Sequence, residues 1–177
     1  MSDATGVAVG ESVEDVAETL VYPDGETTET ALSDLLSEAP VLLTFYTNDF
    51  SPDCIEEWCS FRDYDWFTSN DAVQVVGVSK SRAFTHRKFI DHLGLQFPLY
   101  ADTDLDISSA FGVAYRAFKV APRSRRSCFL LDSEGVVRYK WIAEHPLDPS
   151  RDQPPISEIH EAIVDEFDDD GPETFGF

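Results

Sequence analysis

Runs of β-branched and aromatic residues predict the central strands of this chain. Residues 41–46 and 72–79 are mostly apolar and rich in β-branched or aromatic side chains, which predicts two buried strands, the second of them parallel. Weaker signals of the same kind predict three further elements: a short strand near 16–21, an extended piece at 97–100, and a hairpin formed by 127–131 and 136–141 around the turn at 132–135.

Apolar residues recur at helical spacing between these strands. The segment after Ser81 carries an apolar face and stops at Gly94, a helix-ending residue, and that face is formed by Ala83, Phe84, Phe89, Ile90 and Leu93. Other helices are predicted at 30–37, 52–68, 106–111 and 155–167. Strands that alternate with helices before a final hairpin predict an α/β domain with a central mixed sheet.

Cys54 lies where a helix is expected to begin. Ser51 is a good N-cap, Pro52 suits the first helical position, and Asp53 favours the positive end of the helix dipole. Cys54 then falls in the first turn, where unpaired backbone N–H groups and the dipole favour a thiolate over a thiol. Because the thiolate is the nucleophile, the segment predicts a redox or thiol-transfer site.

A second cysteine follows five residues later on the same predicted helix, at Cys59. In an intact helix the two Cα atoms would lie roughly 8.6 Å apart, beyond the limit of about 7 Å for a disulfide. The pair can bond only if the first turns unwind, which suits a reactive cysteine and a resolving thiol. The alternative is that the two cysteines are unrelated and one fills the core.

The segment resembles the active-site loop of the peroxiredoxins, which reads Pro-x-x-x-Thr/Ser-x-x-Cys. Ser51 and Cys54 match, whereas Thr47 stands in place of the proline. A cysteine five positions on is similar to the bacterioferritin comigratory protein or peroxiredoxin Q subgroup of the AhpC/TSA superfamily. The resemblance covers about residues 13–164 and includes Ser60-Phe61-Arg62-Asp63, Gly77-Val78-Ser79, Phe97-Pro98-Leu99-Tyr100-Ala101-Asp102 and the segment from Arg126 to Gly135. It implies a thioredoxin-like fold.

The resemblance also implies roles for particular residues. Cys54 would be the peroxidatic nucleophile, Cys59 the resolving thiol, and the Ser51 hydroxyl a contact of the peroxide. A cation is needed to hold the peroxide oxygens, and Arg123, Arg125 and Arg126 are the candidates. The resemblance selects Arg126, and solvated loop charge is expected for the other two.

Three further residues are interpreted less directly. Glu57 is kept with the site because it can hold a loop arginine, although an exposed helical glutamate is the preferred interpretation. Thr47 is more flexible and more polar than proline, so a less shielded thiolate and slower turnover are expected. Cys128 is predicted to be a buried strand residue. The cysteine spacing is a poor match to structural zinc, and neither metal nor cofactor is expected.

The chain has 177 residues, with 34 acidic against 13 basic side chains and a formal net charge of −21. Such a charge repels nucleic acid and anionic membranes. The acids are spread along the chain, which favours salt adaptation of the kind seen in halophilic proteins.

Three cysteines, an odd number, favour thiol chemistry in the cytoplasm. One domain is expected over 1–177, with a flexible acidic tail at 168–177.

Two functions are weighed. The first is a thiol-dependent peroxidase that uses Cys54 and Cys59, takes hydrogen peroxide or organic hydroperoxides, and is reduced by a thioredoxin-like or other thiol donor. It would act as a monomer or weak dimer. The alternative is a non-catalytic or redox-sensing binding protein on the same fold.

Overall fold

The structure is a computed structural model, and it describes residues 6–47, 49–50, 52–64, 66–67, 72–115, 123–143 and 154–167. Its main sheet has seven strands in the order β2-β1-β5-β4-β3-β8-β9. The strands are β1 (Ala17–Val21), β2 (Thr27–Ala31), β3 (Val41–Phe45), β4 (Gln74–Ser79), β5 (Leu99–Ala101), β8 (Ser127–Leu131) and β9 (Val137–Ile142). A separate two-stranded ribbon pairs β6 (Ala114–Tyr115) with β7 (Arg123–Ser124).

The strand directions are mixed, as predicted. β4 runs parallel to both β3 and β5, whereas β3 pairs with β8 antiparallel and β8 with β9 antiparallel. The consecutive apolar residues of β3 and β4 are explained by this central place in the sheet, where both faces are covered.

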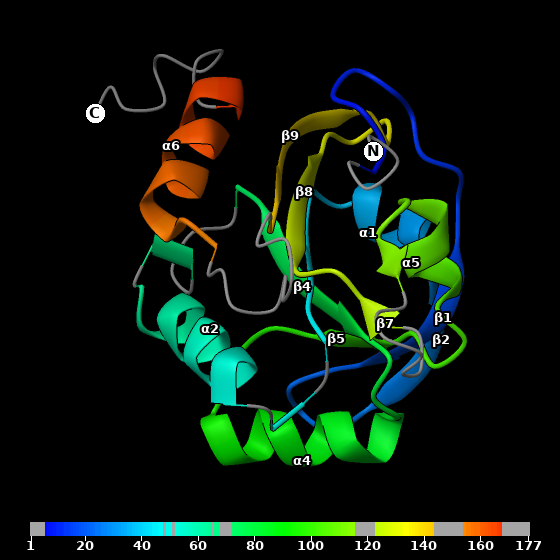
Figure 1. The fold of residues 1–177 in the computed structure, drawn as a ribbon, viewed down its shortest axis with the longest axis vertical. Coiled ribbons are helices and arrows are strands. Elements are labelled where there is room, and N and C mark those ends of the chain that lie inside the picture. The colour runs from blue at the N-terminus through cyan, green and yellow to red at the C-terminus, as the bar shows by residue number, and fades with distance from the viewer. Residues whose placement is uncertain are drawn as a thin grey trace.

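Helices cover both faces of the sheet. Figure 1 shows α2, α4 and α6 on one side and α1 and α5 on the other. Their bounds are α1 (Leu32–Leu36), α2 (Pro52–Asp63), α4 (Ala83–Leu93), α5 (Asp106–Ala110) and α6 (Ile156–Phe167).

Strand β3 contributes side chains to both halves of the core, because successive side chains of a strand point to opposite faces of the sheet. Leu42 and Tyr46 join the cluster under α2, α4 and α6, whereas Leu43 and Phe45 join the cluster under α1 and α5. Trp58 of α2 lies directly over β4, where a Cβ at Gly77 would come within 2.6 Å of its ring. This close approach fixes the height of α2 above the sheet.

Two predicted helices and one residue predicted on an apolar face differ from the structure. Residues 27–31 form β2, which pairs antiparallel with β1, so the helix predicted from residue 30 begins only at Leu32. The helix from Pro52 ends at Asp63 rather than near residue 68. Phe84, predicted on an apolar face, is 62% exposed on α4. Residues 27–31 form a strand through pairing with β1, which is a contact beyond the local segment.

Ser51 and the acidic tail predicted at 168–177 lie outside the described residues. Among the helices of the described ranges, none has both the length and the apolar character needed to cross a membrane.

Candidate active site

Cys54 lies in the first turn of α2, as the capping signals predicted. Its side chain is fully buried, and two polar groups of the described residues contact its sulfur. The Thr47 hydroxyl oxygen is 3.3 Å away, and the Arg126 guanidinium donates to the sulfur from Nη2 at 3.5 Å. A cation and a hydroxyl therefore meet at one thiol at the start of a helix, where the dipole also favours negative charge.

Arg126 reaches this sulfur because of strand pairing. Phe45 at the end of β3 is paired with Ser127 at the start of β8, so the residue before β8 lies beside the segment that leaves β3. The backbone of Arg126 is held as well, since Ala143 N–H donates to its carbonyl at 2.9 Å. Strand β8 thus brings a distant cation to the start of α2.

Glu57 is the second partner of Arg126, and the preferred interpretation of it as an exposed residue was wrong. Its carboxylate is buried and forms an ion pair with Arg126 through Nη1. Burial raises the pKa of Glu57 to about 7, against the opposing effect of Arg126. For Arg126, burial opposes the charged form, yet Glu57 and Cys54 leave its pKa raised. The guanidinium therefore stays charged between a carboxyl group and a sulfur.

Thr47 does not leave Cys54 open to water. Thr47 itself is only 3% exposed, and its hydroxyl oxygen contacts the Cys54 sulfur. In the peroxiredoxin pattern that the segment resembles, a proline at this position would shield the sulfur. The threonine therefore adds a polar contact beside the sulfur.

The other two cysteines differ in character. Cys59 is half-buried on α2 and packs against the core beneath that helix. Cys128 is a fully buried residue of β8, as predicted, and burial raises its pKa well above the ordinary value. Its sulfur contacts the Thr44 hydroxyl at 3.8 Å. A thiol held protonated in the core is a poor nucleophile, which disfavours Cys128 as the reactive cysteine.

The sequence interpretation missed a buried polar cluster beside the site. Asp49 accepts a hydrogen bond from the Tyr46 hydroxyl at 2.6 Å and contacts His86 Nδ1 at 2.7 Å. Asp49 stands among other polar residues between β3 and α2, so the local sequence gave no signal for this contact.

Of the other two arginine candidates, only Arg125 has a described side chain. Arg125 is half-buried and donates to the Ala143 carbonyl at 3.1 Å. The side chain of Arg123 lies outside the described part of the chain. Among the described residues, Arg126 is the candidate that donates a hydrogen bond to the Cys54 sulfur.

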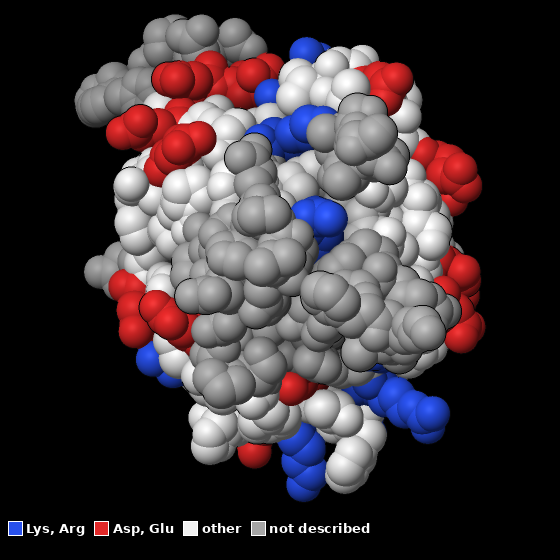
Figure 2. Space-filling view, in the orientation of Figure 1, with Lys and Arg blue, Asp and Glu red and all other residues white. Residues whose placement is uncertain are grey.

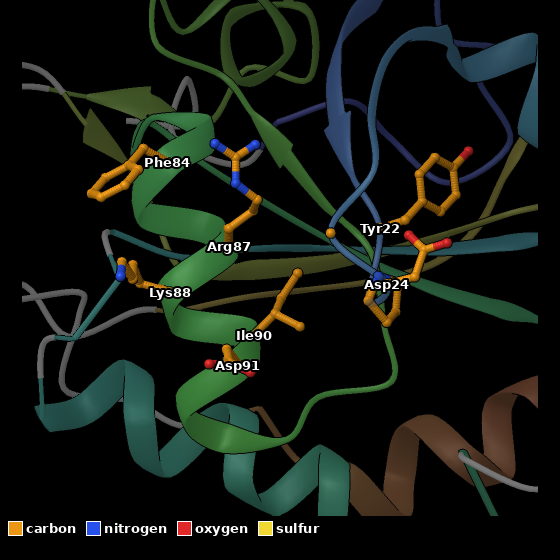
Figure 3. Close-up of a pocket in the computed structure, with 9 residues that line it drawn as sticks. Tyr22, Asp24, Phe84, Arg87, Lys88, Ile90 and Asp91 are labelled. Atoms are coloured by element: carbon orange, nitrogen blue, oxygen red, sulfur yellow. The ribbon is translucent and has the colours of Figure 1, made fainter.

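A surface groove also lies beside α4. Figure 3 shows it between α4 and the turn after β1, with Arg87, Lys88 and Phe84 on the helix and Tyr22 opposite. Its volume is about 350 Å³, and none of its lining residues is a candidate site residue.

Comparison with known proteins gives one concordant result. The model of the AhpC/TSA family matches residues 9–140. A putative peroxiredoxin bcp of Coxiella burnetii is 33% identical over 67% of this chain and 80% of its own length. A chloroplastic peroxiredoxin Q of Triticum aestivum is 35% identical over 56% of this chain, which spans only 45% of that relative.

A solved structure is similar over most of its length. The peroxidoxin BcpB of Mycobacterium tuberculosis superposes with a TM-score of 0.70 at 26% identity, covering 88% of this chain and 94% of its own. This likeness confirms the thioredoxin-like fold that the resemblance implied.

Proposed function

Because this chain belongs to the AhpC/TSA family, we propose that it is a thiol-dependent peroxidase in which Cys54 is the nucleophile. The observation that carries the proposal is the sulfur's setting at the start of α2, with Arg126 Nη2 at 3.5 Å and the Thr47 hydroxyl at 3.3 Å. A non-catalytic descendant would have no need of a buried cation aimed at a buried sulfur, so the alternative is not favoured.

The first step is a displacement at oxygen. The Cys54 thiolate attacks the terminal oxygen of a hydroperoxide, the S–O bond forms and the O–O bond breaks. The leaving alkoxide or hydroxide takes a proton and departs as alcohol or water. Negative charge moves from sulfur to the leaving oxygen, and the guanidinium of Arg126 lies where it stabilises both ends of that movement. Cys54 becomes a sulfenic acid.

The second step joins the two cysteines of α2. The Cys59 thiol attacks the sulfenic sulfur, the S–S bond forms, and the hydroxyl of the sulfenic acid leaves as water. Both residues belong to one helix in the structure. The helix must therefore unwind locally before the sulfurs can meet. A thioredoxin-like or other dithiol then reduces the disulfide by exchange.

Replacing Cys59 by serine tests the resolving role. We expect Cys59→Ser to keep the first step, so that one equivalent of peroxide still converts Cys54 to a sulfenic acid within about threefold of the wild-type rate. Turnover with a thioredoxin donor should fall about a hundredfold, because no intramolecular disulfide forms. Stopped-flow fluorescence, dimedone labelling and mass spectrometry report these quantities.

The matched control is Cys128→Ala, which removes a thiol that the proposed mechanism does not use. It should retain both the first step and turnover. If Cys59→Ser turned over normally while Cys128→Ala did not, the resolving thiol would be Cys128.

We also propose a cytoplasmic location, because the chemistry requires free thiols and the three cysteines are free in the structure. A net charge of −21 opposes self-association and binding to nucleic acid at low ionic strength, which supports a monomer or weak dimer.

Salt adaptation is a separate proposal. Figure 2 shows Asp and Glu side chains spaced around the visible face rather than gathered in one patch. Mutual repulsion of these charges is screened when the Debye length falls to about 3 Å in molar salt. We expect the melting temperature to rise by about 10 °C between millimolar and molar KCl, as followed by circular dichroism. An unchanged melting temperature would contradict the proposal.

A further inference from the structure

Asp49 lies at the centre of a buried hydrogen-bonded cluster between β3 and α2. The side chains of Asp49 and His86 are both fully buried, with Nδ1 and Oδ2 2.7 Å apart. The second carboxylate oxygen of Asp49 accepts from the Tyr46 hydroxyl at 2.6 Å. The backbone N–H of Asp49 donates to the Ser81 hydroxyl at 2.9 Å. The carboxylate and the backbone N–H of Asp49 are thus bonded to three different side chains.

Donor and acceptor chemistry assigns the protons of this cluster. His86 Nε2 lies 2.9 Å from the Tyr100 carbonyl, which can only accept, so Nε2 carries a hydrogen. Burial, followed by Asp49, raises the pKa of Tyr46, so its hydroxyl remains a donor. The contact between His86 Nδ1 and Asp49 then holds a single shared proton. Both nitrogens of His86 are engaged, which leaves it no nitrogen to exchange a proton with a peroxide.

The cluster connects the segment between β3 and α2 to the sheet and to α4. Asp49 lies two residues after Thr47, whose hydroxyl contacts Cys54. His86 belongs to α4, and Tyr100, which holds the far side of the imidazole, belongs to β5.

A second constraint acts on the next residue. Phe50 has a φ of 66°, an unfavourable conformation for a bulky side chain, and its ring packs edge-on against Phe89 of α4 at 5.1 Å. A backbone in this conformation persists only where the surroundings hold it. Asp49 and Phe50 together fasten the segment to α4.

We propose that Asp49 and His86 are positioning residues for the reaction with peroxide. The pair fixes the segment after β3 so that the Thr47 hydroxyl stays against the Cys54 sulfur and the sulfur stays in reach of Arg126. Thr47 has no ring to restrict its own backbone, so the restriction comes from this neighbouring pair. The proposal rests on the proposed peroxidase function.

Two substitutions of Asp49 separate hydrogen bonding from charge. In Asp49→Asn, the amide oxygen still accepts from Tyr46 and the amide nitrogen can donate to a neutral His86. This variant should react with hydrogen peroxide within about threefold of the wild-type rate constant. In Asp49→Ala both bonds are lost, and the rate constant should fall roughly ten- to a hundredfold, as expected when a reacting group is displaced by about 1 Å.

A second readout distinguishes positioning from simple loosening of the fold. Alkylation of Cys54 by iodoacetamide needs no peroxide geometry, so its rate should not fall in Asp49→Ala while the peroxide rate does. His86→Phe should show the same split, and the double variant Asp49→Ala/His86→Phe should lose less than the two single losses combined, because the residues act as one unit.

Ile163→Ala in α6 is the matched control for lost stability, because it creates a cavity in the same core cluster. It should lower the melting temperature and leave the peroxide rate constant intact.

The proposal is overturned if Asp49→Ala reacts at the wild-type rate, if Asp49→Asn loses as much as Asp49→Ala, or if the Ile163→Ala control loses peroxide reactivity in proportion to its stability. A wild-type protein no faster than free cysteine would instead overturn the peroxidase function, with or without a role for the pair.

Discussion

Replacing Cys54 by serine is expected to abolish peroxide reduction, with a loss of about 10³-fold or more in the second-order rate constant. Serine keeps the size of the side chain and its place in the first turn of α2, but its hydroxyl is not ionised at neutral pH. The Arg126 guanidinium would then have an alcohol rather than a thiolate beside it. Peroxide consumption with dithiothreitol as the reductant measures the loss directly and needs no protein donor.

The control for this variant is again Cys128→Ala, which removes a sulfur whose pKa burial raises well above its usual range. It should consume peroxide at the wild-type rate. If Cys54→Ser kept its peroxidase activity, or if Cys128→Ala alone lost that activity, the nucleophile would be a residue other than Cys54. Either result would contradict the proposed function.

Replacing Arg126 by methionine is the second large effect, with an expected loss of about a hundredfold in the rate constant with peroxide. Methionine fills a similar volume but neither donates to the sulfur nor carries charge. The same change leaves the Glu57 carboxylate buried without its cation, which should also destabilise the fold by roughly 3–5 kcal/mol. The effects on rate and on stability must therefore be separated.

The double variant Arg126→Met/Glu57→Gln separates them. Removing both charges relieves the buried carboxylate, so the melting temperature should recover while the peroxide rate constant stays low. Arg125→Met, a change in the neighbouring half-buried arginine, should leave the rate constant within about threefold of wild type. A double variant that regained activity with its stability would show that Arg126 serves the fold rather than the reaction.

Local signals predicted the part of the site that lies within one short segment. The cap, the proline and the acidic residue before Cys54 are neighbours in the chain, and a helix start is a local event. The same holds for Gly94, which ends α4 in a left-handed conformation with a φ of 66°. Helix α1 shows the limit, because residues 27–31 formed a strand only through pairing with β1.

Glu57 shows the same limit in the site. Nothing in the helical sequence around it distinguishes an exposed glutamate from one that is buried against an arginine. The ion pair joins residues 69 positions apart, and it exists because β8 lies beside β3. Resemblance to a family selected Arg126 over Arg123 and Arg125. The pairing of β8 with β3 in the sheet places Arg126 in contact with the Cys54 sulfur.

The chain alone therefore predicted the nucleophile, and it determined the placing of both thiols on one helix and the excess of negative charge, since these depend on neighbouring residues and on composition. Only the folded structure decided which groups surround the sulfur. Arg126 comes from 72 positions away, and His86 meets Asp49 across 37. Contacts of that span are set by strand order and by the packing of α2 and α4 on the sheet, which no local pattern of residues encodes.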